Sequence, residues 1–204
     1  MDESLLQNRD YTVIIAKPAA DMVSPPPGFT ERWAAAESAV LALVQKCEEF
    51  DPDGITVYLP CYASEACEFN QYDRITSPKF TEILHAHLPP EQINLNPVLQ
   101  TALDNYFNRK AAGKTKANGE MILVLIDGEP SDRMGIAKLI REATHKLESN
   151  KELGIGFVQI GEDLLAKGFL TALDDNLKEA GAKLDIVKTI MLDEIQPASL
   201  TQFL

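Results

Sequence analysis

The segment "VLIDGEPSDR", residues 124–133, gathers side chains that are suited to chemistry. A hydrophobic run ends at Asp127, and Glu129, Ser131 and Asp132 follow within five residues. Carboxylate and hydroxyl oxygens are the ligands that Mg²⁺ and Ca²⁺ take, and a carboxylate also serves as a general acid or base. The segment therefore predicts a site at the end of a strand. The alternative is a structural role: a strand end, a turn and a helix N-cap.

Other patterns of catalytic residues are missing from the sequence. The segment 111–120 contains Gly-Lys-Thr, but Asn108 stands where a phosphate-binding loop needs its first glycine, and the segment leads from a helix into a strand. Neither Gly-x-Gly-x-x-Gly nor Gly-x-Ser-x-Gly occurs. His85 and His87 are two residues apart on an expected helix, so they do not share a face. We expect a protein that is not an enzyme and takes no cofactor.

The composition excludes several classes of partner. The 204 residues include 31 acidic and 19 basic side chains, a net charge of -12, which disfavours binding to nucleic acid. Three scattered cysteines form no disulfide or zinc pattern, and we expect Cys47 and Cys61 in the core. No apolar run approaches the roughly 20 residues of a membrane span, and the first ten residues are polar. We expect a cytoplasmic protein without membrane contact.

The elements that must position these residues follow from hydrophobic patterns. Near-continuous apolar runs indicate strands buried on both faces of a parallel sheet, and a polar alternating segment indicates an edge strand over 67–77. The apolar runs are residues 11–16, 55–61, 121–127, 154–161 and 186–192.

Helical periodicity fills the segments between the strands. Asn96 is the expected N-cap of one helix, with Pro97 at its first position and Gly113 near its end. Another helix begins at Ser131 or Asp132, and the helix after it has Leu165 on its apolar face. The expected helices cover residues 29–50, 77–88, 97–113, 132–147, 165–181 and 198–204.

The alternation of strands and helices predicts an α/β fold. We expect a doubly wound, mostly parallel six-stranded sheet with one antiparallel edge strand and helices on both faces, a three-layer sandwich. No change of composition divides the chain, so residues 1–204 form one domain with a core from about 10 to 193. The proline-rich segment 24–28 is a stiff loop rather than a linker.

Four pieces of the sequence are similar to von Willebrand factor type A (vWA) domains. "VLIDGEPSD" resembles the family's strand ending in Thr-Asp-Gly-Glu, and "RDYTVIIAK" resembles its first strand. "CEEFDPDGITVYLP" is similar to the first helix and second strand, and "INLNPVLQTALDNYF" to the segment that carries a metal-site threonine. The resemblance runs from Asp10 to Asp193 and is closest to compact single-domain members from bacteria, cyanobacteria among them.

The resemblance implies a metal-ion-dependent adhesion site, in which Mg²⁺ is held by an Asp, two Ser, a Thr and a second Asp. In this sequence the first Asp falls on Ala16, the two Ser on Pro18 and Ala20, and the Thr on Ile93. Only the last ligand survives, as Asp127. Because Mg²⁺ needs a near-octahedral set of oxygens, one carboxylate does not hold it usefully. The site is degenerate, and we expect no bound metal.

The function implied by this resemblance is a non-catalytic protein–protein interaction or scaffold module that works without a metal ion. Its partner is expected to be another protein, docked over the loops 16–28, 62–66, 90–96 and 127–133. The expected partner-binding residues are Ala16, Lys17, Pro18, Ala19, Ala20, Asp21, Ile93, Asn94, Asp127 and Glu129.

Three alternatives stay open at this point. The chain is a regulatory copy that pairs with a metal-binding vWA relative and supplies Asp127 or Glu129 to its Mg²⁺, or it is a hydrolase on a doubly wound fold. A third alternative gathers Asp21, Asp127, Glu129 and Asp132 around a cation in another geometry. Without a cation, we expect loop N–H groups and water to satisfy Asp127, with Lys17 as the other candidate.

Overall fold

The computed structural model describes residues 4, 6–16, 29–61, 68–86 and 94–195. Of residues 29–33, 35, 60, 61, 68 and 86 it describes the backbone only. The helix expected over 198–204 lies outside the described residues.

Six strands form one sheet in the part of the chain that the structure describes, in the order β3-β2-β1-β4-β5-β6. All neighbouring pairs are parallel except β2 and β3, which are antiparallel. The fold class expected from the sequence is therefore confirmed, including the polar antiparallel strand at one edge. The strands are β1 Asp10–Ala16, β2 Ile55–Cys61, β3 Glu68–Ile75, β4 Glu120–Asp127, β5 Leu153–Ile160 and β6 Val187–Met191.

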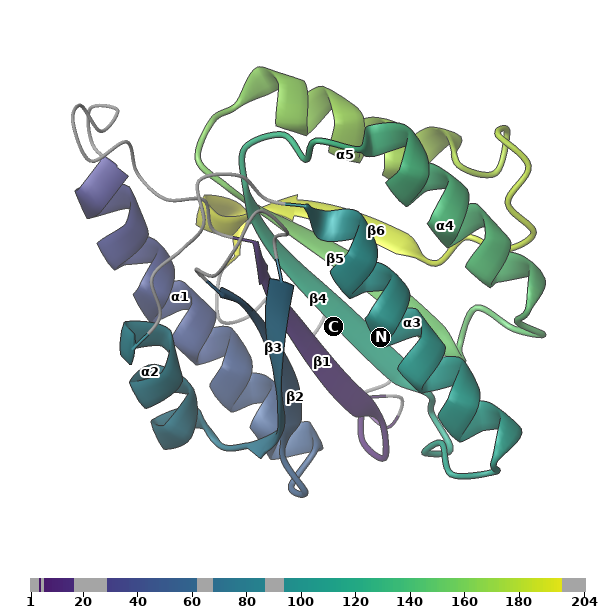
Figure 1. The fold of residues 1–204 in the computed structure, drawn as a ribbon, viewed down its shortest axis with the longest axis horizontal. Coiled ribbons are helices and arrows are strands. Elements are labelled where there is room, and N and C mark those ends of the chain that lie inside the picture. Colours follow the sequence, from purple (N-terminus) through teal and green to yellow (C-terminus); the bar gives the residue numbers. More distant parts are fainter. Residues whose placement is uncertain (1–3, 5, 17–28, 62–67, 87–93, 196–204) are drawn as a thin grey trace.

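Helices cover both faces of the sheet (Figure 1). Val13 and Ile15 of β1 pack in one core with α1 and α2, whereas Ile14 and Ala16 pack in the other with α3, α4 and α5. Cys47 is buried in the first of these cores, as expected. The helices are α1 Phe29–Phe50, α2 Ser77–Ala86, α3 Leu95–Ala111, α4 Arg133–His145 and α5 Leu164–Asn176, followed after β6 by a 3₁₀ turn, η2 Leu192–Glu194.

The start of α3 and the end of α5 are among the helix ends that differ from the expectation. Helix α3 begins at Leu95 with Asn94 as N-cap, so Asn96 is not the cap and Pro97 is not the first helical residue. Pro97 still lies in the first turn of the helix. Backbone N–H groups there have no acceptor within the helix, so the N–H that proline lacks costs no hydrogen bond. Helix α5 ends at Asn176, and the chain reaches Gly181 through turns that close on a positive φ of 99°.

The topology creates two edges with different neighbours. The carboxyl ends of β1, β4 and β5 lie at one edge, where the parallel connections also place the N-termini of α4 and α5. The opposite edge carries the amino ends of these strands and the turns that lead into β2 and β4. No helix among the described residues is both long enough and apolar enough to cross a membrane.

Candidate functional site

Among the described residues, one carboxylate lies where the central strands β1 and β4 end, at the carboxyl edge of the sheet. Ala16 closes β1 and pairs in register with Ile126 of β4, and both side chains are buried. Asp127 ends β4 opposite Ile160 of β5, and it is half-buried and engaged in an interaction. In the described part of the chain, the ends of β1 and β4 therefore place an alanine methyl and one carboxylate at the centre of this edge.

The other acidic side chains at this edge have structural partners. Glu129 forms an ion pair with Arg133 at 2.6 Å. Asp132 caps α4 by accepting the Gly135 N–H at 2.8 Å, and its second oxygen accepts from Asn96 Nδ2 at 3.2 Å. A Cβ on Gly135 would lie 2.1 Å from that second oxygen, so glycine is required for this contact.

The structure brings four of the expected partner-binding residues to the same edge: Ala16, Asn94, Asp127 and Glu129. The other six lie outside the described residues, namely Lys17, Pro18, Ala19, Ala20, Asp21 and Ile93. Where side chains are described, Asp127, Glu129 and Asp132 do not converge as a set of ligands for one ion, and the three acidic groups that do converge lie at the opposite edge.

Three large apolar side chains are exposed at the carboxyl edge: Met134, Leu164 and Leu165, which we name the apolar patch. Their exposed fractions are 80%, 80% and 66%, and they lie in the first turns of α4 and α5. The expectation that Leu165 belongs to the buried face of its helix was wrong. Asp163 caps α5 and sets its phase, so that Ala166 and Leu170 point inward instead.

A lysine lies among three carboxylates at the amino edge. Lys116 Nζ is 3.3 Å from Asp10 and 2.7 Å from Asp53, and it also pairs with Asp51. Asp51 is almost fully buried and accepts the Tyr11 N–H at 3.3 Å. We name these four side chains, Asp10, Asp51, Asp53 and Lys116, the lysine-centred cluster. The three carboxylates have the spacing of metal ligands, but the ammonium group of Lys116 already pairs with all three.

The electrostatics of this cluster favour the charged lysine. Burial lowers the pKa of Lys116, but hydrogen bonds from its ammonium group to Asp51 and Asp53 outweigh this and hold the pKa above its ordinary value. Burial raises the pKa of Asp51, and hydrogen bonding to Asp51 and Lys116 lowers that of Asp53. The ion pairs of the cluster therefore connect the end of α1 to the turn before β4.

Glu120, at the start of β4, is a buried carboxylate beside the cluster. It is 2% exposed, accepts from Thr12 Oγ1 at 2.6 Å and pairs with Arg109 at 2.5 Å. Burial raises the pKa of Glu120 to about 7, although Arg109 and Thr12 favour the ionised form. Arg109 also approaches Asp10 at 3.8 Å, so this pair continues the charge network.

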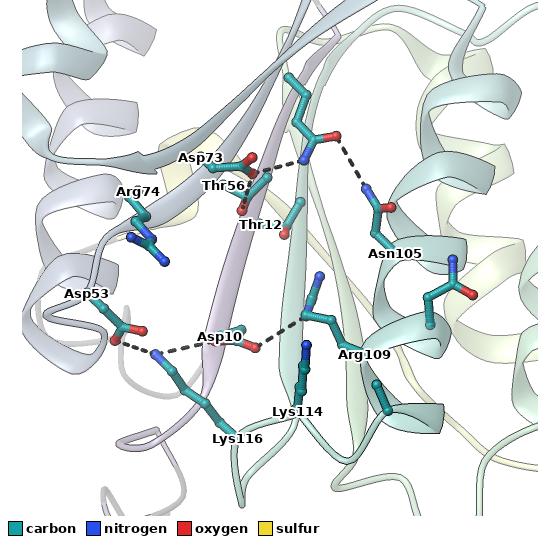
Figure 2. A pocket seen from close by; sticks show the side chains of 13 residues that line it. Asp10, Thr12, Asp53, Thr56, Asp73, Arg74, Asn105, Arg109, Lys114 and Lys116 are labelled. Carbon is teal, nitrogen blue, oxygen red and sulfur yellow. Dashed lines mark hydrogen bonds and ion pairs between the residues drawn. The ribbon is translucent and has the colours of Figure 1, made fainter.

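An open groove of about 740 Å³ lies next to this network, between α3 and the strands β1, β2 and β3 (Figure 2). Twelve of its thirteen lining residues are polar or charged, and Ala112 is the exception. The sequence analysis missed the groove because its residues come from four separate segments. The polar residues that begin β1 and surround the "DPDG" turn were the available signal.

Two solved structures have a fold similar to that of this chain. Manganese-loaded TRAP protein from Plasmodium vivax aligns with a TM-score of 0.51 and 12% identity, over 92% of this chain and 70% of that one. The TFIIH p34 N-terminal domain aligns with a TM-score of 0.50 and 14% identity, over 98% and 97%. No protein-family model and no curated protein sequence matches the chain.

At these identities the similarity concerns the fold alone. Both neighbours have vWA-like domains, and their alignments extend over nearly the whole chain described above. The strand order, the antiparallel edge strand and the two helical layers agree with that architecture. The chain therefore has a vWA-like α/β fold.

Proposed function

We propose that this chain is a non-catalytic protein-interaction module whose partner docks on the carboxyl edge of the sheet without a bridging metal ion. The observation that carries this proposal is the apolar patch. Met134, Leu164 and Leu165 are the large hydrophobic side chains that are exposed among the described residues, and all three lie at that edge.

The apolar patch supplies a physical reason for association. Burying one such side chain contributes roughly 1.5–3 kcal/mol, so three supply enough for the centre of a binding surface. Asp127 and the Glu129–Arg133 pair are on the same edge and give it polar surroundings. An apolar centre with a polar rim is the common anatomy of a protein interface.

Two observations support an interface that needs no metal. Ala16 supplies a methyl group, where the vWA resemblance implies a ligand carboxylate, and its register beside Ile126 fixes it there. Asp132 and Glu129 are engaged within the chain. Of the two structural neighbours, the TRAP protein is manganese-loaded, whereas the p34 domain is a part of TFIIH.

The proposal is tested by capture of the partner from the native host, identification by mass spectrometry and binding measurements with the purified partner. A triple variant, Met134→Ser, Leu164→Ser and Leu165→Ser, is expected to weaken binding at least about 100-fold, since all three anchors are lost. The matched control places Ala172→Ser and Asp175→Ser on the exposed surface of α5. Unchanged affinity in the triple variant would contradict the proposal.

A second arm repeats the measurement with EDTA. Our proposal expects the same affinity with and without the chelator. Binding that needs Mg²⁺ and disappears with Asp127→Ala would instead favour the alternative in which this chain supplies a carboxylate to a metal held by its partner.

A further inference from the structure

The polar groove at the amino edge is far from the proposed docking surface and has a prearranged floor. Asn105 Nδ2 donates to Tyr58 Oη at 2.8 Å and to Gln71 Oε1 at 3.3 Å. Gln71 Nε2 in turn donates to Asp73 Oδ1 at 2.9 Å, and Thr56 Oγ1 donates to the same oxygen at 3.3 Å. This chain of hydrogen bonds fixes the side chains before a ligand arrives, which lowers the entropic cost of binding.

Four cations and three carboxylates line the groove, and Asp51 and Glu120 pair with two of these cations, so the cations differ in whether they have a carboxylate partner. Lys116 is neutralised by the lysine-centred cluster, and Arg109 by Glu120 and Asp10. Arg74 and Lys114 also line the groove, and neither has a carboxylate partner among the described residues. Two cations and the partly satisfied Asp73 therefore face the open space (Figure 2).

The backbone holds Arg74 in an unusual conformation at the groove. Its φ is +55°, a left-handed value that is uncommon outside glycine, and it lies where the β2–β3 register shifts. Gly54 packs against it so closely that an added Cβ would meet the Arg74 carbonyl carbon at 2.8 Å. Such local strain persists only where the surrounding structure enforces it. The backbone from which the Arg74 side chain extends is therefore set by the fold.

From these contacts we infer that the groove binds a small hydroxylated oxyanion. Its phosphate or carboxylate lies against Arg74 or Lys114, because guanidinium and ammonium groups form the strongest hydrogen bonds to such oxygens. Its hydroxyl groups donate to Asp73 and to the amide oxygens of Asn105 and Asn108. A ligand without hydroxyl groups leaves the Asp73 carboxylate facing the anion, so the hydroxylated body is part of the recognition.

The test is an NMR titration of the ¹⁵N-labelled chain with four probes: glucose 6-phosphate, gluconate, glucose and inorganic phosphate. We expect saturable shifts at the amides of Arg74, Asn105 and Lys114 with glucose 6-phosphate or gluconate, at concentrations below about 10 mM. The first two probes distinguish a phosphate from a carboxylate. Glucose and inorganic phosphate each carry half of the recognised chemistry and are expected to bind at least about tenfold more weakly.

Variants locate the binding. Arg74→Asn removes the charge but keeps a residue that tolerates a positive φ, and it is expected to weaken binding at least about tenfold. Arg74→Lys is expected to recover most of the loss, and Lys178→Gln, an exposed cation beyond α5, serves as the matched control. The inference is overturned if no probe gives saturable shifts, if glucose binds as well as the anions, or if Lys178→Gln weakens binding as much as Arg74→Asn.

Discussion

At the residue scale, Lys116 at the amino edge occupies the position between three carboxylates that a metal ion would otherwise suit. Asp51 is 2% exposed, and a buried carboxylate without a counter-charge costs several kcal/mol. The ammonium group of Lys116 offsets this cost for Asp51, and it also pairs with Asp10 and Asp53. The three carboxylates therefore have a structural role in the fold, with Lys116 as their partner in place of a metal ion.

Replacing Lys116 with methionine tests this role. Lys116→Met keeps the length of the side chain but leaves the buried Asp51 unpaired, so we expect the free energy of unfolding to fall by about 3 kcal/mol. The measurement is urea denaturation at neutral pH. Lys114→Met, two residues earlier and without a carboxylate partner among the described residues, is expected to change stability by less than about 0.5 kcal/mol. Equal effects of the two variants would contradict the role assigned to Lys116.

Glu120 gives a prediction about pH. Because burial raises its folded-state pKa to about 7 from 4.5, the folded state holds the proton more tightly than the unfolded state does. The resulting stabilisation is fully present below about pH 4.5 and is lost as the pH rises through about 7. Relative to Glu120→Gln, the wild type is therefore expected to lose about 3 kcal/mol between about pH 4.5 and 8. If the stability of the wild type relative to Glu120→Gln stays constant or rises with pH, Arg109 keeps Glu120 ionised and the prediction is wrong.

Residues of this kind were the hardest to assign from the sequence. Lys116 is 65 positions from Asp51, and no local pattern joins them. Glu120 stands at the start of a hydrophobic strand, where a carboxylate reads as an exposed strand end rather than as a buried one. The acidic residues at 127–132, in contrast, were noticed because they are adjacent in the chain. Two of these, Glu129 and Asp132, turned out to have the structural roles of an ion pair and a cap.

At the element scale, the N-terminus of α4 is fixed by two contacts to one carboxylate. Asp132 accepts from the Gly135 N–H and from Asn96, which belongs to the first turn of α3. The N-cap of α3, Asn94, forms no side-chain capping bond. The two helices that frame the carboxyl edge therefore depend on Asp132, which the sequence indicated as a cap.

Capping variants should reflect this difference. Asp132→Ala is expected to lower the free energy of unfolding by about 1 kcal/mol, because the helix loses a capped N–H and its tie to α3. Asn94→Ala is the matched control at the start of the neighbouring helix and is expected to cost only a few tenths of that amount. Thermal unfolding of the two variants provides the comparison. A larger loss for Asn94→Ala would show that Asp132 does not fix this edge.

The strands could be predicted from the sequence more closely than the helix ends. Near-continuous apolar runs follow directly from burial on both faces, and each expected strand overlaps the observed one to within three residues at either end. Helix ends depend on backbone contacts that periodicity does not record. Leu165 shows the limit, because its spacing fits the apolar stripe of α5 while the capped first turn directs it outward.

At the scale of the whole molecule, the vWA-like fold separates two surfaces at opposite edges of one sheet. The carboxyl edge carries the apolar patch that we propose for a protein partner, and the amino edge carries the charge network and the polar groove. The fold could be predicted from the alternation of strands and helices in the sequence. The groove could not be predicted in this way, because it forms only when β3 lies beside β2 and α3 packs across β1.

The proposed absence of a metal at the carboxyl edge is tested most directly by calorimetric titration with Mn²⁺ and Mg²⁺, comparing the wild type with Asp127→Asn. We predict no saturable binding at Asp127 below about 1 mM, because Ala16 provides no oxygen and a single carboxylate does not hold either ion. Identical titrations of the two proteins would support this prediction. One equivalent of metal bound by the wild type and lost in Asp127→Asn would contradict it.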